Sequence, residues 1–357
     1  MINSVIKGTG SYIPSRIVKN KEFLNNEFYD TRGKKFENPN QEIIDKFEKI
    51  TDIKERRYVT DDLVTSDIGY FAAKEALESS GIDKESIDCI IVAHNFGDIK
   101  PDNRRSDFVP SLAARIKHNL KIKNPETVAY DLPFGCPGWL EGIIHAHGYI
   151  KLGKAKRVLV IGAETLSRII DPHDRDSMIY SDGAGAVILE SVSNTKPVGI
   201  LSHNSRSDTF SQVSMLRMDK SNNPDYNGND LFLKMDGRKL YEYALKTVPQ
   251  LVEDCIGKAN LTIRDISKVL IHQANGKMDD AILQRLFCLY KVSEIPKDIM
   301  PMIISRLGNS SVATLPTLLD MLLKGKLNGY AAKQNDVMVF ASVGAGMNIN
   351  ALVYKMY

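Results

Sequence analysis

The chain has 357 residues, of which 43% are hydrophobic and 25% charged, and its formal net charge is +3, so we expect a globular protein of two domains or one large α/β unit. No apolar run approaches the roughly 18–20 residues of a membrane span, and the N-terminus lacks a signal-peptide core, which predicts a cytoplasmic protein without a membrane partner. The small net charge and the dispersed Lys and Arg residues argue against a nucleic-acid partner, and four scattered cysteines without a Cys-x-x-Cys pair argue against a metal site.

The first part of the chain alternates strand and helix patterns. Apolar runs of strand length and apolar residues at helical spacing mark the elements, and a Thr-Ser-Asp start and a glycine stop bound the clearest helix. In chain order we expect a strand over 2–12, a loop over 24–40, a helix from Thr65 to Gly81, a strand over 87–93, a polar segment over 101–105 and a helix over 109–118.

Residues 128–140 predict a short strand, a tight turn with Cys136 at its apex, and a helix that begins at about Gly138. A cysteine at such a turn can present its sulfur, and the unpaired N–H groups of a new helix favour the thiolate. A buried structural thiol is the commoner fate of a lone intracellular cysteine, but the turn residues Gly135 and Pro137 favour a nucleophile here. We expect the other three cysteines in or near the core: Cys89, Cys255 and Cys288.

Two further strands complete the first half. Residues 157–162 form an apolar run, and residues 181–189 are a glycine-rich turn that leads into another buried strand. The glycines precede a strand rather than a helix, so they are not a phosphate-binding loop. We therefore expect no nucleotide and no other cofactor.

The second half repeats the first. The order helix, polar link, isoleucine and strand over 78–93 recurs over 257–272, and a Gly-Ala-Gly follows late in each half. Ser, Asn, Thr and Pro cluster over 191–197, so we divide the chain into halves of residues 1–192 and 193–357. Alternating, duplicated elements with buried strands predict two similar α/β halves that share a core.

The second half contributes three candidate chemical features. His272 follows a buried strand, where open α/β sheets usually build their sites. Asn309 lies at a glycine turn before a helix, and residues 342–347 end a strand in a backbone that can point N–H groups into a site. Each alone is weak evidence, because such residues are often near-core or turn residues. Asp131 and Asp182 fit turn or cap roles better than catalysis.

Together these features resemble the thiolase superfamily, and most closely the β-ketoacyl-acyl-carrier-protein synthase III family. The resemblance spans nearly the whole chain and is carried by Thr51–Arg57, the Cys136 turn, Ser181–Ala186, His272-Gln-Ala-Asn and Gly308-Asn-Ser-Ser. It implies a thiolase-like five-layer αβαβα fold, a homodimer, and an acyltransferase that performs decarboxylating Claisen condensation in fatty-acid or polyketide-type synthesis.

The resemblance also implies roles at the site. Cys136 takes the acyl group from a thioester, and His272 and Asn309 donate hydrogen bonds to the enolate left when a malonyl thioester loses CO₂. The backbone N–H groups of Cys136 and Ala345 form a second donor set for the tetrahedral intermediate. Ala345 stands where the family usually has glycine.

The substrate-binding positions depart from the usual pattern. Acyl-carrier protein, acyl-coenzyme A or both are the implied partners, but Lys46 and Ile50 replace the residues that clamp adenine, and Glu242 replaces a lysine near the phosphates. The predicted substrate-binding residues are Arg168, Arg238 and Lys277, which keep positive or polar character near the phosphates, Trp139 in the variant Cys-Pro-Gly-Trp turn, and Val109, which reaches across the dimer to close the end of the acyl pocket. Phe108 is the alternative residue that could fill the space left by the small Val109 side chain. The turn resembles that of specialised relatives from secondary-metabolite pathways.

Two other functions fit parts of the sequence. The cysteine could transfer an acyl group to an oxygen, nitrogen or sulfur acceptor, although the intact pair of His272 and Asn309 favours condensation. A non-catalytic partner subunit of a synthase would be expected to have lost Cys136.

Overall fold

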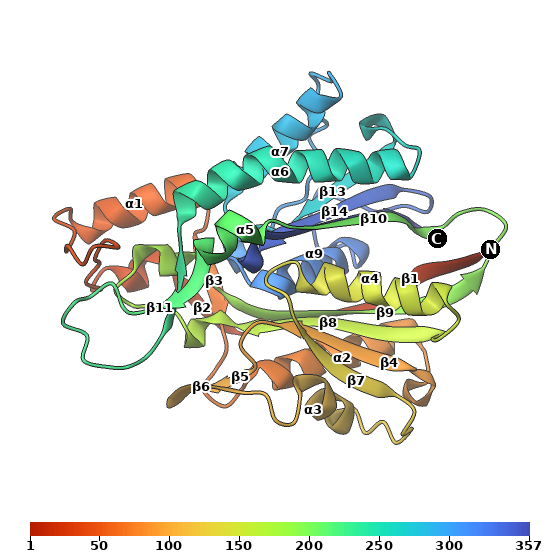
Figure 1. The fold of residues 1–357 in the computed structure, drawn as a ribbon, viewed down its shortest axis with the longest axis horizontal. Coiled ribbons are helices and arrows are strands. Elements are labelled where there is room, and N and C mark those ends of the chain that lie inside the picture. The colour runs from red at the N-terminus through yellow and green to blue at the C-terminus, as the bar shows by residue number, and fades with distance from the viewer.

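The computed structural model describes residues 1–357 and has five layers, helix–sheet–helix–sheet–helix, which confirms the predicted αβαβα fold (Figure 1). The N-terminal sheet has the strand order β1 (Ile2–Tyr12), β9 (Asp182–Ser193), β8 (Arg157–Thr165), β4 (Cys89–His94) and β7 (Val128–Pro133). The C-terminal sheet has the order β10 (Gly199–Ser207), β15 (Asn348–Lys355), β14 (Val337–Gly344) and β13 (Lys268–Ile271).

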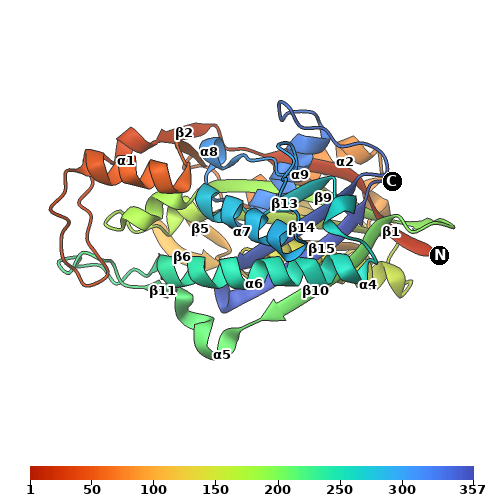
Figure 2. The same cartoon turned by 90° about the horizontal axis from the view of Figure 1, so that it is seen from above.

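Helices cover both sheets on both faces (Figures 1 and 2). The outer layers are α2 (Thr65–Ser80) with α3 (Leu112–Asn119) on one side, and α6 (Gly237–Lys258) with α7 (Gly276–Leu289) on the other. The middle layer is α4 (Gly138–Lys151) with α9 (Thr314–Leu323). Every residue of β4 and β14 is buried, because helices cover both faces of these strands, and all of them except His94 and Ser342 are apolar.

Separate hydrophobic clusters fill the spaces between the layers. One lies between the N-terminal sheet and its outer helices, a second between the C-terminal sheet and its outer helices, and a third surrounds α4 between the two sheets. The third cluster includes Trp139, Phe340 and Leu318, contributed by both halves of the chain. The two halves therefore share one core.

The two halves repeat the same topology. Each half has a parallel pair of neighbouring strands, β4 with β8 and β13 with β14. The second strand of each pair has an antiparallel strand on its other side, β9 beside β8 and β15 beside β14. A counterpart of β7 is not a regular strand, but the Ile299 carbonyl accepts a hydrogen bond from Val269 N–H at 2.8 Å, so that segment occupies the corresponding place beside β13. The predicted division at residues 192 and 193 falls at the end of β9.

Several predicted elements need correction. The segment at 101–105 belongs to a hairpin of β5 (Asp98–Lys100) and β6 (Asn103–Asp107). The helix predicted from 109 begins only at Leu112, because Ser111 is its N-cap and accepts from Ala114 N–H. Cys89 and Cys255 are buried as expected, but Cys288 is exposed, because it faces solvent on α7 beside the buried Phe287.

None of the helices combines the length and the apolarity that a bilayer crossing requires.

A small cap packs beside the N-terminal half around Arg56. It comprises β2 (Arg16–Lys19), α1 (Asn40–Thr51) and β3 (Glu55–Tyr58), whose buried apolar residues join others from both halves of the chain in a fourth cluster. The Arg56 guanidinium is buried and donates to three oxygens at 2.6–3.1 Å, the carbonyls of Met178 and Val18 and the side chain of Asn20. It also lies over the ring of Phe23. Burial lowers the pKa of Arg56 to about 10, so it stays charged at neutral pH.

Replacing Arg56 by alanine should destabilise the cap strongly. Three oxygens would lose a charged donor, and a cavity would remain, so we expect a loss of about 3 kcal/mol in the free energy of unfolding. Thermal unfolding followed by circular dichroism measures it. Arg16→Ala is the matched control, since Arg16 is exposed on the neighbouring strand. Equal melting temperatures for the two variants would contradict this role.

Candidate active site

The turn that carries Cys136 depends on glycine at two points of backbone contact between the halves. Gly135 has φ +68°, and a Cβ there would lie 2.8 Å from the Ala345 nitrogen. A Cβ on Gly344 would lie 2.5 Å from the Cys136 nitrogen. No side chain fits at either place, so the glycines let the start of α4 touch the turn between β14 and β15.

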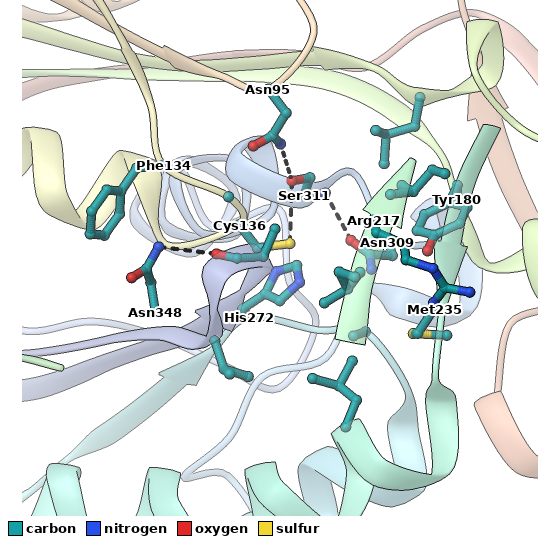
Figure 3. A pocket seen from close by; sticks show the side chains of 18 of the residues that line it. Asn95, Phe134, Cys136, Tyr180, Arg217, Met235, His272, Asn309, Ser311 and Asn348 are labelled. Atoms are coloured by element: carbon teal, nitrogen blue, oxygen red, sulfur yellow. Dashed lines mark hydrogen bonds between the residues drawn. The ribbon is translucent and has the colours of Figure 1, made fainter. Parts of the chain in front are cut away.

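Cys136, His272 and Asn309 meet at a single cavity of about 360 Å³ (Figure 3). Cys136 precedes the first turn of α4, His272 directly follows β13, and Asn309 follows the short helix α8 (Ile304–Leu307). The carboxyl ends of parallel strands meet at one edge of a sheet, which is why residues distant in sequence converge here. The remaining wall is largely apolar and includes Leu166, Leu216, Met218, Leu233, Met235, Leu240 and Val343.

His272 is neutral at physiological pH. Its side chain is buried, and burial lowers the pKa of the imidazole to about 4. Its Nδ1 has no hydrogen-bond partner. A neutral ring with the proton on Nε2 can still donate one hydrogen bond to an oxygen in the cavity.

The amide of Asn309 is held by its own chain. Ser311 N–H donates to Asn309 Oδ1 at 2.8 Å, and the Asn309 backbone bonds to Ile179 and Ser181 at 3.0 and 2.8 Å. Because Oδ1 is engaged by a backbone donor, the Nδ2 group is left to donate elsewhere. The asparagine therefore presents a fixed neutral donor.

The sulfur of Cys136 accepts a hydrogen bond from the Ser311 hydroxyl at 3.3 Å. Burial raises the pKa of the Cys136 thiol to about 11, which outweighs the lowering by this hydrogen bond. The sequence predicted that the start of α4 would favour the thiolate, but burial keeps the resting cysteine a thiol. Neither the Cys136 nor the Ala345 N–H donates to a backbone carbonyl outside the regular helices and strands.

A second cavity of about 290 Å³ leads from the surface towards the first and shares Met235, Leu240, Ala274, Met278 and Asn309 with it. Lys46, Ile50 and Arg238 line this outer cavity. The Arg238 side chain is 90% exposed and pairs with Glu242 at 3.1 Å. Lys277 is exposed on the first turn of α7 and lines neither cavity.

Two predicted substrate-binding residues are structural instead. Trp139 lies in the shared core with its ring 6.3 Å from that of Phe340, because its position on α4 faces the C-terminal sheet. Arg168 bonds to Asp61 and to the carbonyls of Thr60 and Leu63. It therefore holds a loop and does not reach either cavity.

Phe108 and Val109 lie away from the cavity of their own chain. Phe108 stacks on His94, with ring centroids 5.7 Å apart, and Val109 is 86% exposed. Asp131 and Asp182 have the structural roles that the sequence predicted. Asp131 accepts from the first two N–H groups of α3, and Asp182 accepts from Val59 and Ser167 N–H.

Sequence reasoning missed several residues at the cavity. Asn95 and Tyr180 line it, and Glu164 lies directly behind Asn95. Ser311 was visible only as part of the Gly-Asn-Ser-Ser motif. A polar pair after a buried strand, His94-Asn95, was the available signal for Asn95.

Comparison with known proteins agrees with this architecture. Residues 130–209 match the model of 3-oxoacyl-[acyl-carrier-protein] synthase III, and residues 256–356 match the model of its C-terminal part. The chain is 33% identical over 356 residues to β-ketoacyl-[acyl-carrier-protein] synthase III of Staphylococcus aureus strain JH1, covering 99% of both chains.

Solved structures show the same fold. The synthase III of Thermus thermophilus is 29% identical with a TM-score of 0.80, covering 99% of each chain. The priming β-ketosynthase of the R1128 polyketide pathway is 26% identical with a TM-score of 0.81, covering 99% of this chain and 96% of that one.

These findings place the chain among the thiolase-like condensing acyltransferases of fatty-acid or polyketide synthesis. Within that class, it belongs to the β-ketoacyl-acyl-carrier-protein synthase III family.

The low pKa of His272 should appear in the stability of the protein. The unfolded chain binds a proton near pH 6.5 and the folded one near pH 4, so folding loses stability as pH falls from about 6.5 to 4. Between pH 7 and pH 5, wild type should lose about 2 kcal/mol more than His272→Gln, measured by denaturant unfolding. His147, whose pKa is also lowered to about 4, contributes equally to both proteins and cancels. Equal losses would contradict a buried neutral His272.

Proposed function

We propose that Cys136 carries the acyl group during a decarboxylating condensation, and that His272 and Asn309 stabilise the enolate. The observation that supports this most directly is the convergence of the three side chains on one apolar cavity. In the first half-reaction Cys136 loses its proton and its thiolate attacks an acyl thioester; the carrier leaves as a thiolate and takes up a proton in place of the one that Cys136 released. The tetrahedral oxygen accepts hydrogen bonds from Cys136 and Ala345 N–H.

In the second half-reaction, a malonyl thioester in the same cavity loses CO₂. The electron pair of the broken bond becomes an enolate, whose oxygen accepts from His272 Nε2–H and Asn309 Nδ2–H. The enolate carbon then attacks the acyl carbonyl, and the bond to the Cys136 sulfur breaks. His272 acts as a neutral donor, so this step needs no proton transfer from the ring.

The half-reactions should separate by mutation. Cys136→Ser should abolish acylation and condensation, while the control Cys288→Ser, at an exposed position, should behave as wild type. His272→Ala and Asn309→Ala should each lower malonyl decarboxylation by roughly 10²–10³-fold and leave acylation of Cys136 much less affected. Mass spectrometry of the acyl adduct and release of labelled CO₂ measure the two steps.

Two results would overturn these assignments. If His272→Ala and Asn309→Ala both decarboxylate the malonyl thioester normally but fail to acylate Cys136, these two residues act in acylation and their proposed role is wrong. An acyl adduct on Cys136 without any decarboxylation in wild type would favour transfer of the acyl group to a heteroatom acceptor.

The acyl donor is carried on acyl-carrier protein in this proposal. The outer cavity gives a path from the surface to Asn309 for a long, narrow carrier arm, and it is lined by three cations, Lys46, Arg175 and Arg238, and one carboxylate, Asp176. No tryptophan lies there, since the single tryptophan is buried in the core. These features favour an acidic carrier protein over the stacked adenine of coenzyme A.

Two copies of the chain form a homodimer in the same proposal. β7 is an edge strand that pairs only with β4, so its other side has free backbone groups. Exposed apolar residues gather along this side: Phe108, Val109, Val128 and Tyr149. Pairing of two β7 strands would cover them and carry Val109 towards the acyl cavity of the partner.

The smaller side chain of Val109 should then permit acyl chains longer than acetyl. Each buried CH₂ contributes up to about 0.8 kcal/mol, so hexanoyl and decanoyl carriers should acylate Cys136 faster than acetyl carrier, and Val109→Phe should shorten the range. Phe108→Ala is the control, because Phe108 stacks on His94 of its own chain and should leave the range unchanged. Acylation rates across the three donors are the measurement.

A strict acetyl preference in wild type would contradict the deep pocket. A monomeric mass in sedimentation would remove the basis for a gate supplied by a partner.

A further inference from the structure

A buried carboxyl group lies behind the cavity at the end of β8. Glu164 is 1% exposed, and no lysine or arginine pairs with it. Its Oε2 accepts from both the backbone N–H and the side-chain amide of Asn95, at 3.1 and 2.5 Å. Burial raises the pKa of Glu164 to about 8, so the group is mostly neutral at pH 7.

A chain of hydrogen bonds leads from this carboxyl group to the sulfur of Cys136. Asn95 Nδ2 donates to Ser311 Oγ at 3.0 Å, and Ser311 Oγ donates to Cys136 Sγ at 3.3 Å (Figure 3). Since the Asn95 backbone N–H already donates to Glu164 Oε2, that oxygen is an acceptor, and the Asn95 atom beside it is the amide nitrogen. With Asn95 donating to it, the Ser311 oxygen is an acceptor, and its own hydrogen points to the sulfur.

The backbone holds Ser311 in place for this contact. Its φ is +51°, a left-handed conformation that residues other than glycine rarely adopt. Its N–H donates to Asn309 Oδ1, so the same residue fixes the asparagine and contacts the cysteine. The neighbouring Ser310 hydroxyl lies 3.4 Å from Thr314 Oγ1 instead. A strained residue held from several sides is characteristic of functional sites.

We propose that Ser311 is a catalytic hydrogen-bond donor to the sulfur of Cys136, and that Asn95, anchored by Glu164, is the positioning residue that directs its hydroxyl. This inference rests on the proposed function of Cys136. The sulfur bears negative charge twice in that function, as the nucleophile and again as the leaving group when the carbon–sulfur bond breaks. The hydroxyl stabilises both forms by donating a hydrogen bond, and its proton stays on oxygen.

The other titratable groups at the cavity do not take this role. Tyr180, Arg217 and His272 line it, but none of them donates to the sulfur. Glu164, behind Asn95, opposes the thiolate once it ionises. A donor that carries no charge suits a site where burial disfavours ions.

The pH dependence of Cys136 alkylation by iodoacetamide on the free enzyme tests the proposal. Ser311→Ala should alkylate roughly ten- to a hundredfold more slowly than wild type at every pH from 7 to 10, because the thiolate loses a donor. Ser310→Ala is the matched control and should follow wild type. Alkylation of Cys136 should be slowed less in Asn95→Ala than in Ser311→Ala. If Ser311→Ala does not fold, the comparison of Asn95→Ala with wild type tests the proposal.

Glu164→Gln keeps an acceptor for Asn95 but cannot ionise. The alkylation rate of Cys136 in this variant should equal that of wild type at pH 7. Above about pH 9 it should be faster, because in wild type the charge on Glu164 opposes formation of the thiolate. A purely structural role would not produce this difference between the two pH ranges.

Failure of this inference is distinguishable from failure of the proposed function. If wild type forms the acyl adduct on Cys136 but folded Ser311→Ala alkylates like Ser310→Ala, the donor role is wrong and the nucleophile stands. If wild type forms no adduct, the proposed function is wrong whatever the alkylation profiles show.

Discussion

Backbone contact between the two halves of the chain is the constraint on which the site depends. The start of α4 and the turn after β14 approach so closely that neither Gly135 nor Gly344 has room for a Cβ. This contact places Cys136 and Ala345 next to each other in the wall of the cavity. It exists because the halves are duplicated, with α4 and α9 packed between two sheets whose strands end at the same edge. A closer approach of the halves would make the two backbone segments clash.

Arg217 lines the cavity as a cation, but the buried groups at and behind Cys136 are neutral at rest, and burial is the cause. It lowers the pKa of His272, raises those of Cys136 and Glu164, and so favours the neutral form of each. An enolate or a thiolate formed in such a place gains more from each neutral donor than it would in water. Donors that are already fixed, such as the Asn309 amide held by Ser311 N–H, need no reorganisation when the charge appears. The arrangement therefore suits a reaction whose charges are transient.

The sequence predicted the architecture well because its signals were local or repeated. Apolar runs marked the buried strands, and the recurrence over 78–93 and 257–272 predicted the shared core. Trp139, Arg168 and Cys288 were misplaced because nothing in the sequence says which face of a helix meets the second half, or which loop a cation holds. Glu164 was missed for a related reason. It ends an apolar strand like any surface carboxylate, and only the fold places Asn95 between it and Ser311.

The apolar wall of the cavity shows why substrate specificity is harder to predict than the chemistry of the reaction. It is formed in part by a two-stranded ribbon, β11 (Leu216–Asp219) and β12 (Phe232–Met235), in which Leu216 pairs with Met235 and Met218 with Leu233. These four apolar side chains line the cavity together with Arg217, while Lys234, which pairs with Arg217, is buried in ion pairs with Asp171 and Asp174. A slip of one residue would turn Lys234 towards the acyl chain, so the ion pairs fix the register that keeps the wall apolar. None of these residues belongs to a family motif. Substitutions in the ribbon can therefore change which acyl chains fit without touching the residues proposed to carry the reaction.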